Sequence, residues 1–206
     1  MGDANAEKGR RQLASEARRS LLMQAAITCF VESGIARTSM RDIARKAGVS
    51  IGNLYNHFPG RDDLIAEIAR METQGLTGIV EAVEACEERK QAIESFVTRY
   101  FALCAEPVSA VLTIEITSEA LRNPAIGKLF SGNREMLIAC LSKAMALNGP
   151  EPTRAEEQWF QQVAGLVTDT VEGFALRIGL GEKTATAADK KALMTFADCA
   201  VNRDRP

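Results

Sequence analysis

Histidine and aromatic residues are scarce in this 206-residue chain, which has one histidine and only 5% aromatic residues. His57 is that single histidine, and the chain has no HExxH, GxSxG, P-loop or glycine-rich nucleotide motif. Metal-dependent hydrolysis, acyl transfer and phosphoryl transfer therefore lack the residues that usually perform them. The sequence predicts a protein that is not an enzyme and that uses no cofactor or metal.

Long apolar runs and paired cysteines are also missing. No stretch approaches the roughly 18 to 20 apolar residues of a membrane-spanning helix, and residues 1–20 carry charges where a secretion signal has its apolar run. The cysteines are odd in number and form no CxxC pair, which argues against a disulfide framework or a zinc site. We expect a cytoplasmic protein whose cysteines are reduced and mostly buried.

Charge is divided unevenly along the chain. Residues 1–70 contain 11 basic and 8 acidic residues, a net charge of +3. Since the whole chain has 25 basic and 27 acidic residues, residues 71–206 contain 14 and 19, a net charge of −5. The N-terminal part is therefore the part suited to a polyanion such as DNA, although so small an excess is also compatible with an ordinary solvated surface.

Short helices separated by turn residues are expected near the N-terminus. Apolar residues recur with a helical period over residues 13–30, which predicts a helix that ends near Gly34. Hydroxyl residues that can cap helices precede two further segments, at about residues 39–47 and 51–57. Gly48 between them allows a tight turn. Two short helices joined in this way are typical of a helix-turn-helix.

Helical periods continue through the remainder of the chain, so an all-α fold is expected, with an N-terminal three-helix head and a larger C-terminal helical body. Residues 108–117 are rich in β-branched side chains, which favour a strand. We predict a helix there, because the neighbouring segments are helical and a single strand cannot pair its backbone groups. Further helices are expected at about residues 126–147, 153–178 and 185–201.

Residues 38–68, TSMRDIARKAGVSIGNLYNHFPGRDDLIAEI, resemble the DNA-binding signature of the TetR family of bacterial regulators. The resemblance covers about residues 15–70 and rests on the pattern IAxxAGVSxGxLYxHF. It implies a sequence-specific regulator, by default a repressor that a small-molecule effector releases from a palindromic operator. One departure is Arg61, where many members have lysine, and this exchange replaces a point charge with a planar fork.

The resemblance and the physical character of the residues together indicate which side chains contact DNA. Gly52 lets the DNA backbone approach, Asn53 can pair with an adenine edge, and most of the others can donate to phosphates. The expected contact residues are Thr38, Ser39, Arg41, Ser50, Gly52, Asn53, Tyr55, Asn56, His57 and Arg61. Four arginines, Arg10, Arg11, Arg18 and Arg19, either add contacts or only solubilise the N-terminal segment.

The expected organisation is a flexible basic arm over residues 1–14, a helix-turn-helix DNA-binding domain over 15–62, and a ligand-binding and dimerisation domain over 63–206. The resemblance implies a homodimer formed through the last two helices, and an effector that acts by moving the helix shared by head and body. Candidate pocket residues, most of which are expected to be core, are Phe96, Tyr100, Phe101, Cys104, Ile116, Trp159 and Phe174. An apolar or aromatic effector is favoured.

Two alternatives to an effector-controlled regulator remain open. In the first, one of Cys86, Cys104 and Cys140 acts as a redox sensor in place of the ligand. In the second, which the missing motifs make less attractive, the chain is a small-molecule-binding protein or an enzyme.

Overall fold

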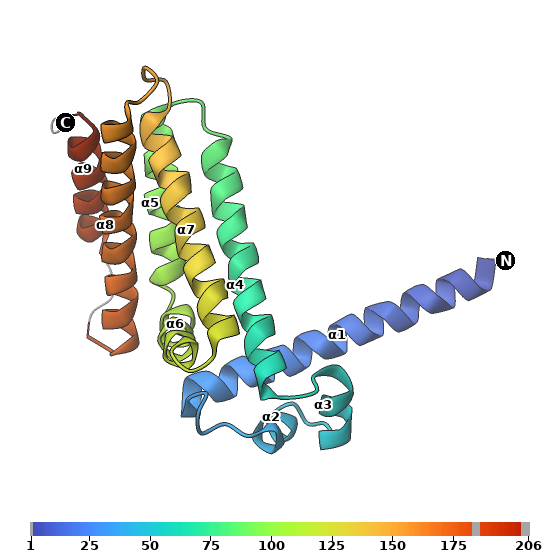
Figure 1. Ribbon diagram of the computed structural model, residues 1–206. Coiled ribbons are helices and arrows are strands. Elements are labelled where there is room, and N and C mark those ends of the chain that lie inside the picture. Colours follow the sequence, from blue (N-terminus) through green and yellow to red (C-terminus); the bar gives the residue numbers. More distant parts are fainter. Residues whose placement is uncertain (1, 183–185, 203–206) are drawn as a thin grey trace. The chain divides into compact units, whose positions relative to one another are not determined.

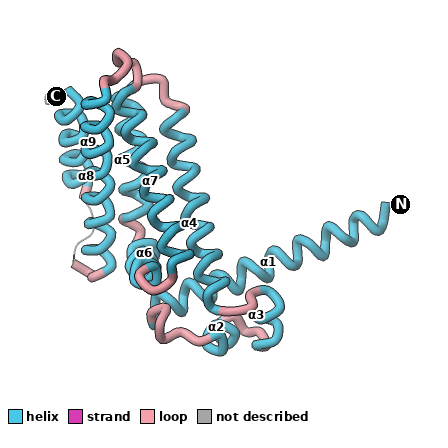
Figure 2. The backbone as a smooth tube through the Cα atoms, viewed as in Figure 1, coloured by secondary structure: helices cyan, strands magenta, loops and turns pink. Residues whose placement is uncertain are grey.

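The computed structural model describes residues 2–182 and 186–202, and every regular element in those ranges is a helix (Figure 1, Figure 2). The helices are α1 (Gly2–Ser33), α2 (Met40–Lys46), α3 (Ile51–His57), α4 (Arg61–Glu84), α5 (Arg89–Cys104), α6 (Pro107–Ala120), α7 (Pro124–Ala146), α8 (Arg154–Gly179) and α9 (Ala187–Asn202). The expected all-α fold is confirmed, including a helix across the β-branched segment.

The chain separates into two compact units, which we call the head, residues 1–70, and the body, residues 71–206. The division falls inside α4, between Arg70 and Met71, whereas the sequence suggested a boundary near residue 62. The difference has a simple cause, because Leu64, Ile65 and Ile68 in the first turns of α4 are all buried. The start of α4 is therefore a structural part of the head.

The first helix is longer than its apolar pattern indicated. It begins at Gly2, so residues 2–14 of the predicted arm are helical, and the flexibility of the arm stays a prediction. This segment has no proline or β-branched residue and contains three alanines, one glutamate, one lysine and two arginines, which favour a helix. The side chain of Arg11 lies outside the described residues, and that of Arg10 is exposed.

The body is a bundle in which α7 packs on α8 and α5, while α5 also packs on α9 (Figure 1). Large apolar side chains fill its interior, among them Phe96, Leu137, Leu141, Met145 and Val167, each at most 1% exposed. The sixth helix crosses one end of this bundle and packs on α7 and α8. A Cβ atom at Gly179 of α8 would lie 2.5 Å from Cδ1 of Ile114, so a larger residue there would require the Ile114 side chain of α6 to shift.

Local hydrogen bonds explain why residues 107–120 form a helix despite their β-branched side chains. Pro107 stands in the first turn, where its missing N–H is not needed, and the Glu106 carboxylate accepts from the backbone N–H of Ser109 at 2.6 Å. The hydroxyls of Thr113 and Thr117 donate to carbonyls one turn earlier, at 2.9 and 2.6 Å. Capping and packing on α8 therefore outweigh the intrinsic strand preference.

None of the helices in the described ranges is, by itself, long and apolar enough to cross a membrane. By length and composition alone, α5 and α6 taken together satisfy that test, although they are bent by 81° at the break between them.

Candidate nucleic-acid interface

Side-chain caps define the two short helices of the helix-turn-helix. The Ser39 hydroxyl accepts from the backbone N–H of Asp42, and the Asp42 carboxylate accepts from the backbone N–H of Ser39 at 3.1 Å, which completes a capping box at α2. The hydrogen bond that the Ser39 hydroxyl donates to the Asp42 carboxylate, followed by that from the Ser39 backbone N–H, holds the pKa of the Asp42 carboxyl below its usual value. At α3, the Ser50 hydroxyl accepts from the backbone N–H of Asn53 at 3.2 Å. Gly48 in the connecting turn has φ of 66°, a conformation that favours glycine.

The third helix buries one face and exposes the other. Leu54 is fully buried and Phe58, which caps the helix at its C-terminal end, is 1% exposed. The side chains of Ser50, Tyr55 and Asn56 are exposed, and Tyr55 reaches 47%. A short helix with this division presents hydroxyl and amide groups outward from a fixed apolar base.

Gly52 lies on the exposed part of α3 and has free space above it. A Cβ atom built at Gly52 would meet nothing within 4 Å. Packing within the protein therefore does not require glycine here, and the backbone of α3 is open to a close approach from outside.

Asn53 and His57 are half-buried, so other residues of the head cover part of each side chain. The buried Oδ1 atom of Asn53 has no hydrogen-bond partner in the described part of the chain. The backbone carbonyl of His57 accepts from Nη1 of Arg19 at 3.4 Å. The Asn53 side chain therefore keeps an unused acceptor, which is buried in this orientation of the amide.

Two of the predicted contact residues serve the head itself. Thr38 is 4% exposed, and its hydroxyl lies 2.8 Å from the carbonyl oxygen of Gly34 and 3.2 Å from that of Cys29. Its side chain is therefore placed inside the head, which differs from the predicted role as a phosphate clamp. Arg61 is half-buried and its Nη1 donates to the carbonyl of Ile35 at 3.2 Å.

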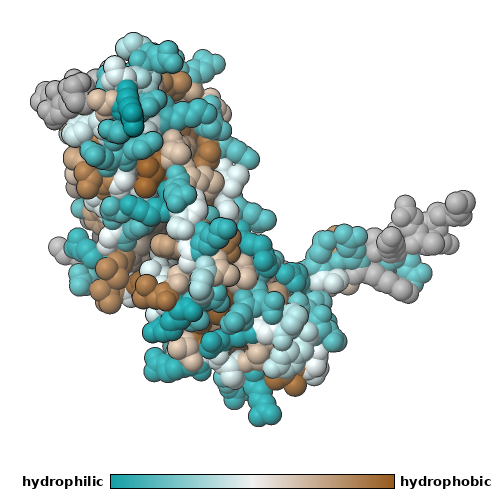
Figure 3. Space-filling model, viewed as in Figure 1, coloured by the Kyte–Doolittle hydropathy of each residue, from teal (hydrophilic) through white to brown (hydrophobic). Residues whose placement is uncertain are grey.

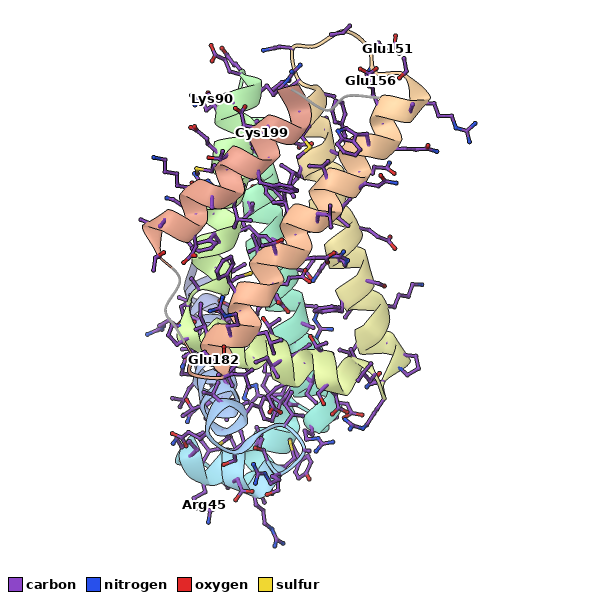
Figure 4. All side chains as sticks on the ribbon, turned by 90° about the vertical axis from the view of Figure 1, so that its left-hand side faces the viewer. Arg45, Lys90, Glu151, Glu156, Glu182 and Cys199 are labelled. Carbon is purple, nitrogen blue, oxygen red and sulfur yellow. The ribbon has the colours of Figure 1, made fainter. Side chains whose placement is uncertain are left out.

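The remaining predicted contact residues are exposed near the starts of α2 and α3. Arg41 is exposed in the first turn of α2, next to the Ser39 capping box, and Ser50 is exposed at the start of α3. Arg45 also projects from α2, as Figure 4 shows, but its guanidinium pairs with Asp42. Lys46 pairs with Glu32 at 2.8 Å. Arg41 is therefore a cationic group on this surface that takes no part in the ion pairs formed by Asp42 and Glu32.

Six of the seven predicted pocket residues of the body gather in or beside one core cluster. Phe96, Tyr100, Phe101 and Cys104 are buried in it, and Trp159 and Phe174 pack against it half-buried. The rings of Phe101 and Phe174 meet nearly edge to face with centroids 5.3 Å apart. Ile116, on α6, is also buried but does not belong to this cluster.

Charged residues that the sequence reasoning did not single out lie beside this cluster. The hydroxyl of Tyr100 donates to Oε1 of Glu172 at 3.0 Å, and Nη2 of Arg134 lies 2.6 Å from the Asp169 carboxylate. Nη1 of Arg134 is 3.7 Å from Oε2 of Glu172, is buried, and has no hydrogen-bond partner in the described residues. These residues come from α5, α7 and α8, so no local sequence pattern could have grouped them.

Glu72 adds a further carboxyl group to this polar cluster. Burial raises the pKa of Glu72, and the negative charge of Glu172 raises it further. Burial also raises the pKa of Glu172, against the opposing effects of the Tyr100 hydroxyl and Arg134. In the described part of the chain no cationic side chain pairs with Glu72. The polar cluster, defined as Glu72, Tyr100, Arg134, Asp169 and Glu172, thus holds more acidic than basic groups.

The cysteines proposed as redox sensors differ in their surroundings. Burial raises the pKa of the Cys104 thiol to about 12 and that of Cys140 to about 11. A thiol with so high a pKa forms little of the reactive thiolate at neutral pH. Cys86 is half-buried and its sulfur lies 3.3 Å from the carbonyl oxygen of Ala82. The structure therefore disfavours Cys104 and Cys140 as sensors.

Comparisons with known proteins connect the head to a family. The sequence profile described as "Bacterial regulatory proteins, tetR family" matches residues 22–68. The HTH-type transcriptional repressor KstR2 of Rhodococcus jostii is 37% identical over 82 residues, which are 39% of this chain and 40% of that protein. The HTH-type transcriptional regulator UidR of Escherichia coli K12 is 28% identical over 128 residues, 62% of this chain and 63% of that protein. These matches span less than two thirds of either relative.

Solved structures resemble this chain over nearly its whole length. GusR of Salmonella enterica aligns with a TM-score of 0.71 and 22% identity, over 90% of this chain and 95% of that one. A TetR-like transcriptional regulator from Rhodococcus sp. RHA1 aligns with a TM-score of 0.73 and 18% identity, over 91% and 97%. Residues 22–68 therefore resemble the TetR family of bacterial regulatory proteins in sequence, and the chain has a fold similar to that of the TetR-like regulator.

Proposed function

We propose that this protein is a sequence-specific DNA-binding transcriptional regulator that acts as a repressor, like the relative whose name states that activity. The observation that carries the proposal is the exposed polar face of α3, with free space above Gly52 and Tyr55 47% exposed beside it. A helix of this kind fits the major groove of B-DNA. Side chains that reach phosphates fix its register, and those that reach base edges provide sequence preference.

Different residues carry the two kinds of contact. Arg41, Ser50 and Tyr55 are assigned to phosphates, because they are exposed donors at the helix starts and on the open face of α3. Asn53 is assigned to base reading, since its Oδ1 acceptor has no partner within the described residues and its amide can pair with an adenine edge when it turns outward. Asn56, His57 and Arg61 remain candidates for further contacts.

The salt dependence of binding tests this assignment. Each phosphate contact contributes about −0.9 to the slope of log K against log salt concentration, so Arg41→Ala is expected to make the slope shallower by about that amount. Arg99 is exposed on α5 in the body, so Arg99→Ala is a matched control that removes the same charge. Equal slopes for wild type and Arg41→Ala would remove Arg41 from the interface.

We further propose a homodimer formed through α8 and α9, which lie side by side in the body (Figure 4). Leu166 and Leu176 on α8 and Leu180, the residue that caps this helix, are 55%, 49% and 64% exposed. Their spacings of ten and four place them on one face with Gly173. Phe196 on α9 is 44% exposed. Figure 3 shows apolar residues exposed among hydrophilic ones on the body. Pairing with a second copy would remove this apolar face from water.

Sedimentation measurements distinguish this face from other exposed apolar residues. Leu176→Glu places a charge in the proposed interface and is expected to shift the protein to a monomer. Leu121 is 84% exposed at the end of α6, so Leu121→Glu is a control expected to leave the dimer intact. A dimer that persists in Leu176→Glu would place the interface elsewhere.

The polar cluster of the body is proposed as the part of an effector site that determines which chemical groups bind. Its excess of carboxyl groups, two of them with raised pKa values, favours a ligand that brings a cationic amine or several hydrogen-bond donors. The adjoining rings of Phe96 and Phe101 suit the apolar part of such a ligand. Glu72 belongs to α4, the helix that also contributes Leu64 and Ile68 to the head. An effector bound at Glu72 would therefore contact a helix that belongs to both the head and the body.

Release of labelled operator DNA tests the effector chemistry. Ligands that combine an aromatic ring with an alkylamine, which is cationic at neutral pH, are expected to release the DNA more effectively than neutral or carboxylate analogues of the same shape. Glu72→Gln is expected to reduce the response to amines, whereas Glu81→Gln, an exposed change on the same helix, is expected to leave it unchanged. A preference for carboxylates in the wild-type protein would contradict the proposed chemistry.

A further inference from the structure

Arg19 of α1 contacts both the end of α3 and the start of α4. Its Nη1 donates to the backbone carbonyl of His57 at 3.4 Å, and its Nη2 lies 3.0 Å from the Glu67 carboxylate. The guanidinium carbon also lies 4.4 Å from the centre of the Phe58 ring, within range of a cation–π interaction. One side chain therefore joins the last residue of α3, the residue that caps it, and α4.

Glu67 is held in place independently of Arg19. Arg70, one turn later on α4, donates to the same carboxylate oxygen of Glu67 from Nε at 3.0 Å and from Nη2 at 2.5 Å. Hydrogen bonds from Arg70 first, and from Arg19 next, hold the pKa of the Glu67 carboxyl below its usual value, although partial burial opposes them. Glu67 is thus an ionised anchor on α4 that draws the Arg19 guanidinium toward it.

The third helix depends on such ties because it has only seven residues. A helix this short is not stable by itself, so its position is set by tertiary contacts. At its N-terminal end the Ser50 cap provides one contact, and at its C-terminal end Phe58 is buried beneath the guanidinium of Arg19. Removal of the Arg19 contacts would leave the C-terminal end held by packing alone.

We infer that Arg19 is a positioning residue for DNA reading, which fixes the C-terminal end of α3 against α4 through His57, Phe58 and Glu67. The inference rests on the proposed DNA-binding function and replaces the direct phosphate contact that the sequence left open for Arg19. The same contacts couple α4 to α3, because a displacement of Glu67 on α4 would move the Arg19 guanidinium that donates to the His57 carbonyl on α3. Arg19 acts on DNA through α3.

A charge-neutralising change at Glu67 distinguishes positioning from direct contact. If Arg19 bound a phosphate, Glu67→Gln would free its guanidinium and remove a negative charge from the head, so DNA affinity would rise. If Arg19 positions α3, Glu67→Gln weakens the tie and DNA affinity falls. The two roles therefore predict changes of opposite sign for the same variant.

The experiment measures affinity for two duplexes of equal length, one enriched from random DNA and one of mixed sequence, at several salt concentrations. Arg19→Lys keeps the charge but loses the planar fork, and it is expected to bind the enriched duplex about tenfold more weakly, as is Glu67→Gln. The loss for the mixed duplex is expected to be smaller, and the salt slope of Arg19→Lys is expected to match wild type. Glu16→Gln, which removes an exposed charge of α1, is the control and is expected to bind no more weakly than wild type.

Thermal melting of each variant selects a temperature at which all of them are folded. An affinity of Glu67→Gln equal to or above that of wild type, or an unchanged enriched-to-mixed ratio in Arg19→Lys, overturns the inference. If the wild-type protein binds neither duplex, the proposed function itself is contradicted. This outcome is separate from the comparison of the variants, which tests only the role of Arg19.

Discussion

Gly52→Ala is expected to stabilise the protein and at the same time to weaken its binding to DNA. A Cβ atom at Gly52 would meet nothing within 4 Å, and the residue is exposed in α3. Replacing a helical glycine by alanine without strain increases the free energy of unfolding by about 0.5–1 kcal/mol. For a chain of this size that gain raises the melting temperature by about 1–4 °C.

The same methyl group would occupy the space that the proposed interface leaves for the DNA backbone. Forcing an additional methyl group into a close-packed contact costs about 1–3 kcal/mol, which corresponds to roughly a 5-fold to 150-fold loss of affinity. The loss is expected for specific and mixed-sequence duplexes alike, because the DNA backbone is common to both.

Fluorescence anisotropy with a labelled duplex and thermal melting by circular dichroism together test this prediction. Gly132 is exposed on α7 and also has free space around it, so Gly132→Ala is a matched control. That control is expected to gain a similar stability and to keep the wild-type affinity. If Gly52→Ala binds DNA as tightly as the wild-type protein does, the space above Gly52 is not where the DNA backbone approaches, and the assignment of this face is refuted.

Three further substitutions examine the head and the body. Tyr55→Phe removes an exposed hydroxyl and is expected to weaken binding to all sequences by about 0.5–1.5 kcal/mol, and unchanged affinity at matched salt would contradict the phosphate assignment. Thr38→Val removes a buried hydroxyl that lies against the Gly34 and Cys29 carbonyls. It is expected to lower the free energy of unfolding by about 1–2 kcal/mol without changing the DNA affinity of the folded protein, and a large loss of affinity would restore Thr38 as a contact. Because the pKa of Glu72 is raised in the fold, its ionisation favours the unfolded chain as pH rises above the ordinary value of 4.5. Glu72→Gln is therefore expected to raise the melting temperature at neutral pH, with a smaller difference below pH 4.5, and equal differences at both would contradict the burial argument.

Features that depend on neighbouring residues were predictable from the sequence. The capping box of Ser39 and Asp42 is set by residues three positions apart, and the turn at Gly48 needs only its own backbone freedom. The exposed face of α3 follows from the helical period around the buried Leu54. For these elements the sequence contains both interacting partners within one or two turns.

Features that join distant residues were not predictable. Arg61 looks like a phosphate donor, yet its hydrogen-bond partner is the carbonyl of Ile35, 26 positions earlier. Thr38 also looks like a phosphate donor, and although its hydroxyl lies near the carbonyl of Gly34 only four positions away, its burial depends on the folded head. The contact of Tyr100 with Glu172 joins residues 72 positions apart. A backbone carbonyl or a distant carboxylate leaves no local pattern, so its role appears only in three dimensions.

Selection of bound sequences from random duplex DNA at fixed salt shows whether two heads of a dimer read a palindromic DNA site. We expect enrichment of a palindrome whose half-sites are about 34–36 Å apart, which is about one helical turn, or a multiple of that distance. No enrichment, or enrichment of a single unpaired half-site, would contradict this expectation.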